Sequence, residues 1–189
     1  PSVILQIIEM YCKDFNDNYE IIGEVKIKPE IDDGYFKFVY KVEGVLVNQA
    51  DAVLIKTVSG NSSFLDFLLF KQEVAPREGC QTDNLLMAVE ETKTSDDESR
   101  NTGVYQRGSK FVYIASYYRN VRLYMLYNEE LDAREDKKPS DTSIFGTNIL
   151  LTLGVTVVGK EISRWFKPFE SLDELIDFKC KMRQPPVGN

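Results

Sequence analysis

The chain has 189 residues, of which 43% are hydrophobic and 12% aromatic, and a formal net charge of −7. This size and apolar content predict one domain spanning residues 1–189 with a sizeable core. The sequence contains no histidine, which excludes Ser-His-Asp and Cys-His catalysis and His-ligated zinc, so any chemistry must use carboxylates, lysine, tyrosine or a hard metal ion.

The first half of the sequence predicts one helix followed by a series of strands. Apolar residues at the i, i+3, i+4, i+7 spacing of an amphipathic helix occur over residues 3–15. Residues 19–28 and 35–47 are β-rich runs joined through Asp33-Gly34, a turn signal that predicts an antiparallel hairpin. Three further strands are predicted at residues 50–57, 63–71 and 85–94.

The second half alternates helices with short strands. The run at 85–94 is apolar on both faces, which is typical of a central strand. In the helix predicted at 100–118, Gly108 and Ala115 lie on one stripe, where small residues would let the helix approach a sheet. The remaining predictions are strands at 121–127 and 155–159 and helices at 142–154 and 171–182, the last opened by a capping box of Ser171 and Glu174. This order predicts an α/β fold, with a mixed β-sheet flanked by α-helices.

Two acids interrupt predicted apolar strands. Asp66 lies in FLDFLLF, and Glu91 lies near the end of LLMAVEETKT. An unpaired charge is costly to bury, whereas two carboxylates from neighbouring strands can share Mg²⁺, which usually takes only one or two protein carboxylates. Lys93 lies two residues after Glu91 and therefore on the same face of a strand. Asp51, at the start of an adjacent predicted strand, is the alternative first ligand, and an ordinary surface ion pair of Glu91 with Lys93 is the competing structural interpretation.

The residues LDFLLFK, then a loop, then LLMAVEETKT and a helix resemble the D…E-x-K signature of the PD-(D/E)xK nuclease superfamily, which includes type II restriction endonucleases. The likeness covers about residues 60–127, with Leu65 where the family commonly has proline. It implies a restriction-endonuclease-like fold and Mg²⁺ held by Asp66, Glu91 and the Thr92 carbonyl. Lys93 would orient or activate the attacking water. The resemblance also implies Gln106 and Glu9 as auxiliary residues.

The stretch from Arg100 to Asn128 contains no acidic residue although the chain is acidic overall. A cationic face on such a chain can bind nucleic acid, and the competing interpretation is a solvated helix face. Arg100 and Asn101 are candidates for contacts with base edges. The residues expected to contact DNA are Arg100, Asn101, Arg107, Lys110 and Arg119.

These features together predict a Mg²⁺-dependent endonuclease that cuts double-stranded DNA. We expect a homodimer, because two DNA strands require two active sites. No apolar run is long enough to span a bilayer, and the three widely spaced cysteines fit a reducing cytoplasm. Pro1 in place of methionine indicates a processed product or a piece of a longer chain. The alternatives are a nuclease-like fold used as a non-catalytic binding or assembly subunit, and an acidic structural or viral protein without a site.

Overall fold

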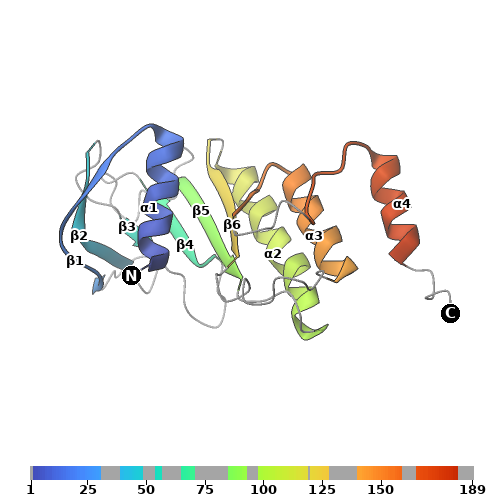
Figure 1. The fold of residues 1–189 in the computed structure, drawn as a ribbon, viewed down its shortest axis with the longest axis horizontal. Helices are drawn as coiled ribbons and strands as arrows, with labels where there is room; N and C mark the ends of the chain where they lie inside the picture. Colours follow the sequence, from blue (N-terminus) through green and yellow to red (C-terminus); the bar gives the residue numbers. More distant parts are fainter. Residues whose placement is uncertain are drawn as a thin grey trace. The chain divides into compact units, whose positions relative to one another are not determined.

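The computed structural model describes residues 2–30, 39–48, 54–56, 65–70, 85–92, 98–118, 120–127, 140–158 and 165–182. These residues form helices together with strands in both antiparallel and parallel pairs, so the predicted mixed α/β class is confirmed (Figure 1). The chain divides into two compact units. One comprises Pro1–Val89 and Ala115–Arg122, and the other comprises Glu90–Ile114 and Leu123–Asn189.

The observed elements follow the predicted order wherever the structure describes them. The predicted turn at Asp33-Gly34 lies outside the described residues. In chain order the elements are α1 (Ser2–Phe15), β1 (Tyr19–Glu30), β2 (Val39–Val47), β3 (Leu54–Lys56), β4 (Phe67–Phe70), β5 (Leu85–Thr92), α2 (Glu98–Tyr117), β6 (Arg122–Tyr127), α3 (Asp141–Thr152), β7 (Thr156–Val158) and α4 (Leu172–Met182).

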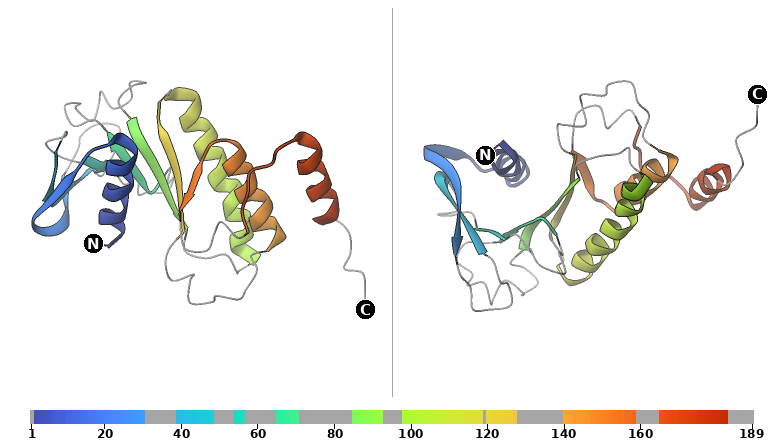
Figure 2. Two further views of the ribbon diagram at one scale, coloured as in Figure 1. Left: turned by 45° about the horizontal axis from the view of Figure 1, so that its top comes forward. Right: turned by 90° about the horizontal axis from the view of Figure 1, so that it is seen from below.

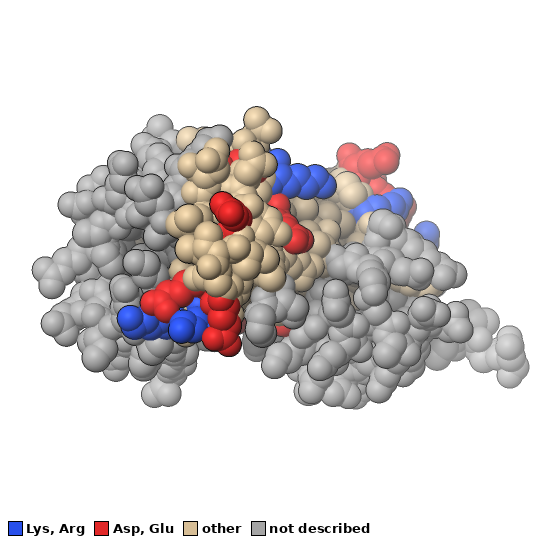
Figure 3. Space-filling view, turned by 60° about the vertical axis from the view of Figure 1, so that its left-hand side comes forward, with Lys and Arg blue, Asp and Glu red and all other residues tan. Residues whose placement is uncertain are grey.

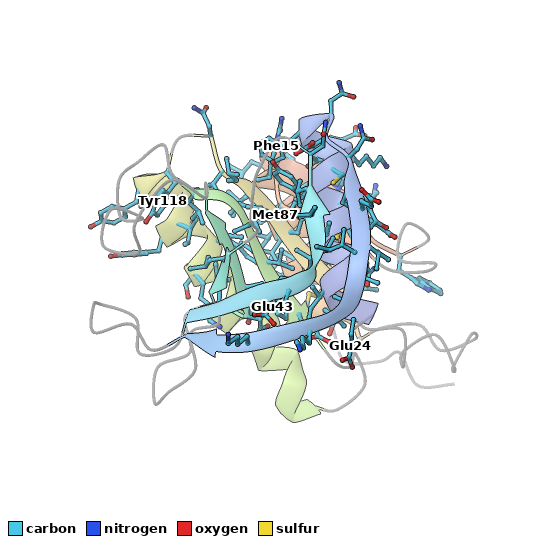
Figure 4. The ribbon with its side chains drawn as sticks, turned by 90° about the vertical axis from the view of Figure 1, so that its left-hand side faces the viewer. Phe15, Glu24, Glu43, Met87 and Tyr118 are labelled. Carbon is cyan, nitrogen blue, oxygen red and sulfur yellow. The ribbon has the colours of Figure 1, made fainter. Side chains whose placement is uncertain are left out.

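The first unit is an antiparallel sheet with α1 on one face. Hydrogen-bonded neighbours follow the sequence order from β1 through β4 to β5, with Ile55 opposite Leu69 and Leu68 opposite Ala88. Helix α1 contacts β1, and its apolar stripe, including Ile7 and Ile8, is buried (Figures 1 and 2). Met87, labelled in Figure 4, lies among the interior side chains. Burial of this stripe and of the inner sheet residues provides the core of the unit.

Helix α1 ends in a Schellman motif in which asparagine takes the usual place of glycine. Asn16 has φ 52°, and the Asp17 N–H donates to the Cys12 carbonyl at 2.9 Å. Asp17 is buried and accepts hydrogen bonds from the Asn18 N–H at 2.7 Å and from the Tyr11 hydroxyl at 3.3 Å. Burial, followed by the charge of Asp17 and the hydrogen bond to it, raises the pKa of Tyr11 to about 12.

A bulge interrupts the ladder between β1 and β2. Ile21 pairs with Val45 and Lys26 pairs with Glu43, so that Gly44 alone stands opposite residues 22–25. Gly44 has φ +85°, and a Cβ at this position would overlap the carbonyl oxygen of Glu24. Figure 4 shows Glu24 and Glu43 near the bend of the two strands. Only glycine satisfies both the backbone conformation and the close approach at this bend.

The second unit is organised around α3, which is buried on nearly all sides. Ser140 caps its first turn, and the Val155 N–H closes its last turn on the Leu150 carbonyl at 3.0 Å, across Gly154 with φ +86°. β6 and β7 form a parallel pair. A Cβ added at Gly108 of α2 would lie 3.4 Å from Leu150 Cδ2, so this small residue approaches α3, which lies beside α2 in Figure 1. Ala115, the other small residue, is exposed.

Helix α4 packs against α3 through aromatic rings. The ring centroids of Phe145, Phe169 and Phe178 lie 5.7 to 5.9 Å apart. The predicted capping box is present at the start of α4: Ser171 Oγ accepts from the Glu174 N–H at 3.1 Å, and Glu174 accepts from the Glu170 N–H in place of the Ser171 N–H. No described helix has both the length and the apolar character needed to cross a membrane.

The two glycines with positive φ provide a matched pair of substitutions. Gly154→Ala should lower the free energy of unfolding by about 1 kcal/mol, because it adds only the left-handed backbone penalty. Gly44→Ala should cost about 3 kcal/mol or more, because overlap with the Glu24 carbonyl adds to the same penalty. Urea unfolding of both variants measures the difference. Equal losses would contradict the close approach at Gly44.

The raised pKa of Tyr11 predicts a pH dependence at the alkaline end. The folded state favours the protonated phenol, so this stabilisation is fully present below pH 10 and is lost as pH rises through about 12. Tyr11→Phe should cost about 1 kcal/mol at neutral pH through loss of the hydrogen bond to Asp17. The stability difference between wild type and variant should then shrink between pH 10 and about 12. Urea unfolding at stepped pH tests this, and a constant difference would refute it.

Candidate functional site

The end of β5 carries two adjacent carboxylates in different environments. Side chains alternate along a strand, so Glu91 shares a face with Met87 and Val89 whereas Glu90 points to the opposite face. Glu90 is buried and Glu91 is half-buried. The alternation predicted from the sequence is therefore present, and it separates a shielded acid from one that reaches solvent.

Glu90 forms an ion pair with Lys110 of α2. Lys110 Nζ lies 2.9 Å from Glu90 Oε1, and the two side chains are 20% and 5% exposed. Removing two charges from water is costly, and their attraction compensates only at short range and with good geometry. The pair joins the end of β5 to α2 within the second unit.

The position of Lys110 follows from the packing of α2. Phe111 and Ile114 are buried, and Gly108 faces α3. Lys110 is therefore next in sequence to a residue of α2 that enters the core. Its aliphatic stem can extend along apolar surface while its ammonium reaches Glu90. Lys110 was expected to contact DNA, but its ammonium is engaged here by a buried carboxylate.

Asp66 lies at a bend directly before β4, whereas the sequence analysis placed it inside a strand. β4 starts at Phe67, which pairs with Val89 of β5, and the preceding Leu65 is fully buried. The physical reason is that a half-buried carboxylate at a bend keeps contact with water, which a position in the middle of an apolar ladder would deny it. Asp66 belongs to the first unit and Glu91 to the second.

The remaining predicted site residues are either described by their backbone alone or lie outside the described residues. Thr92 is the last residue of β5, and four others lie on α2 by their backbone, with side chains outside the description: Arg100, Asn101, Gln106 and Arg107. Lys93, Asp51 and Arg119 lie outside the described residues.

Glu9, the suggested auxiliary acid, has a different partner within the first unit. It accepts a hydrogen bond of 3.0 Å from the Tyr19 hydroxyl, joining α1 to the start of β1. This hydrogen bond is the main cause that raises the pKa of Tyr19. The described contacts of Glu9 are therefore those of a link between helix and strand.

The donor atoms at the end of β5 are compatible with a hard cation. Carboxylate oxygens are the ligands that Mg²⁺ prefers, and it commonly keeps several waters beside one or two protein carboxylates. Among the described residues, no three or more side chains of His, Cys, Asp or Glu gather as a metal-binding group. A magnesium ion bound by described residues would thus have few protein ligands and keep most of its coordinated waters.

The sequence analysis missed the role of Glu90. The signal was present, because a strand predicted to be apolar on both faces has no open face on which an acid could stand. Glu90 therefore needed a cation from whichever element covers it. An acid-free helix immediately after the strand contains the candidate cations, among them Lys110.

Comparison with known proteins found no matching family model, no matching curated protein and no matching solved structure. The nuclease resemblance consequently rests on the sequence motif. On the face shown in Figure 3, described lysine and arginine side chains lie close to aspartate and glutamate side chains and form no continuous cationic field. A DNA-binding surface would have to involve residues other than the described ones on that face.

The Glu90–Lys110 pair can be tested by a double-mutant cycle. Lys110→Met leaves a buried carboxylate without its cation and should lower the free energy of unfolding by about 3 kcal/mol or more. Adding Glu90→Leu should recover most of that loss, because an apolar pair replaces the unpaired charge. Urea unfolding of the two single variants and the double variant provides the coupling energy.

A control comes from an exposed pair in the same unit. Lys167 Nζ lies 2.7 Å from Glu174 Oε1, and the Lys167 side chain is mostly exposed. Lys167→Met should cost much less than Lys110→Met, because water screens the exposed charge. Similar losses at the two lysines, or no recovery in the double variant, would show that burial of Glu90 does not depend on Lys110.

Proposed function

We propose that the chain is a Mg²⁺-dependent endonuclease with a restriction-endonuclease-like fold, which hydrolyses phosphodiester bonds of double-stranded DNA in the cytoplasm as a homodimer. The observation that carries the proposal is the end of β5, where a half-buried Glu91 follows a buried Glu90 neutralised by Lys110. The order of antiparallel β3, β4 and β5 followed by α2 and β6 supports it.

Neutralisation of Glu90 matters for the chemistry of its neighbour. Two adjacent anions would repel each other and compete for any cation, whereas the short contact with Lys110 offsets the charge of Glu90. Glu91, half-buried on the opposite face of β5, is the acid at the strand end that we assign to the metal. A single carboxylate with access to water suits a hydrated Mg²⁺.

The proposed roles follow the D…E-x-K resemblance. By that resemblance, Glu91, Asp66 and the Thr92 carbonyl would be the metal ligands, and Lys93 would orient the attacking water and stabilise negative charge on the phosphate. Bound Mg²⁺ supplies Lewis-acid stabilisation of the scissile phosphate. This set of groups hydrolyses a phosphodiester without histidine, in keeping with the composition.

A non-catalytic assembly subunit is the second candidate, and exposed apolar side chains favour it. They occur on both units: Ile21 and Ile22 on β1, and Leu172 and Ile176 on α4. Exposed apolar residues on a strand and on a helix are typical of surfaces that bind other proteins. This candidate predicts an intact fold that cleaves no DNA.

Cleavage assays on supercoiled and linear duplex DNA with Mg²⁺ or Mn²⁺ distinguish the two candidates. Wild type should cleave, and chelation by EDTA should abolish cleavage. Glu91→Gln and Asp66→Asn should each lower the rate on the order of 100-fold or more, because a ligand of the charge-stabilising metal is lost. Circular dichroism should show an unchanged fold.

Asp177→Asn provides the control, since it removes one carboxylate charge at an exposed position on α4. Its cleavage rate should equal that of wild type. Absence of cleavage with either metal on all DNA forms would reject the endonuclease and favour the assembly subunit. Cleavage that survives Glu91→Gln would place the chemistry elsewhere.

A further inference from the structure

The end of β5 extends past the start of its neighbour β4. Phe67 is the first residue of β4, and it pairs with Val89 of β5. The residues of β5 that follow Val89 are Glu90, Glu91 and Thr92. The described ladder with β4 therefore stops just before the two acids. Since pairing with a neighbouring strand helps to set where the side chains of a strand point, this end of β5 has less support from β4 than its middle has.

A side-chain contact takes over where the described ladder with β4 stops. Lys110 Nζ lies 2.9 Å from Glu90 Oε1, and the two side chains are only 20% and 5% exposed. A charge-assisted hydrogen bond of this length fixes both the distance and the direction between its two groups. Because little water reaches the pair, its attraction is screened less than that of a surface ion pair.

Lys110 lies on a part of α2 that is held by packing. Phe111 and Ile114, which follow it, are 1% and 3% exposed. Gly108, which precedes it, lies so close to α3 that an added Cβ would be 3.4 Å from Leu150 Cδ2. Side chains in a densely packed interior have little room to shift. The Lys110 ammonium therefore ties the end of β5 to a well-anchored part of the second unit.

Glu91 directly follows Glu90, and adjacent side chains of a strand point to opposite faces. A contact that holds the Glu90 side chain therefore also sets the direction in which the Glu91 carboxylate leaves the strand. We propose that Lys110 is a positioning residue, which sets the affinity of Glu91 for a divalent cation by holding Glu90. The inference rests on the proposed function only in assigning a metal ion to Glu91.

Orientation of the strand end can be separated from its stability. In the double variant Glu90→Leu/Lys110→Met an apolar contact replaces the ion pair, so the free energy of unfolding should return close to that of wild type. Apolar contacts are non-directional, however, and orient the strand end less strictly than a charge-assisted hydrogen bond does. Metal affinity should therefore stay low in a variant whose stability is restored.

Titration with MnCl₂ in the absence of DNA measures the affinity through the electron paramagnetic resonance signal of free Mn²⁺, an ion that prefers the same oxygen ligands as Mg²⁺. Wild type should bind Mn²⁺, and Glu91→Gln should abolish this binding. Lys110→Met and the double variant should each raise the dissociation constant about tenfold or more, as is typical when a residue that orients a metal ligand is lost. Lys110→Arg keeps the charge and should bind more tightly than Lys110→Met. Urea unfolding records the stability of each variant.

Lys167→Met is the matched control, because it removes the same charge from the mostly exposed ion pair with Glu174 in the same unit. It should leave the dissociation constant unchanged. Wild-type affinity in the double variant would overturn the proposal, and so would equal losses in Lys110→Arg and Lys110→Met.

The same titration separates this proposal from the proposed function. If wild type shows no Mn²⁺ binding that depends on Glu91, both the positioning role and the metal site of the endonuclease are wrong. If Mn²⁺ binds at Glu91 and the double variant weakens it, but wild type cleaves no DNA, the endonuclease is rejected and the positioning role of Lys110 stands.

Discussion

The ion pair between Glu90 and Lys110 is the interaction on which the second unit depends for the placement of α2. A carboxylate buried in a strand keeps its charge only if a cation comes within a few ångströms, and Lys110 meets this requirement at 2.9 Å. Phe111 and Ile114 are buried on the same helix, so burial and charge pairing set its orientation together. Apolar packing alone would tolerate rotation of the helix more readily than a buried charge does.

The two neighbouring acids, Glu90 and Glu91, lie in different environments. Glu90 forms the ion pair that links β5 to α2, and Glu91, on the other face of β5, is half-buried. In the first unit, the geometry depends in a similar way on one position, since Gly44 permits the bulge that bends β1 and β2.

Local sequence patterns predicted most of the described elements because each pattern has a local cause. The helical stripe of α1, the alternation in β5 and the capping box at Ser171 need no knowledge of distant residues. Local patterns were not sufficient where residues distant in sequence determine the environment of a side chain. Asp66 was expected inside a strand and lies at the bend before it, and the neighbour of Gly108 is Leu150 of α3.

The sequence by itself determined the order and type of the elements and the exclusion of histidine chemistry. These properties depend on composition and on spacing along the chain. Only the tertiary structure decided which of the two acids at the end of β5 is shielded and that Lys110 is its partner. The reason is physical: the pKa, charge and availability of a side chain depend on the surfaces that cover it, and residues 20 positions apart in the chain supply that cover here.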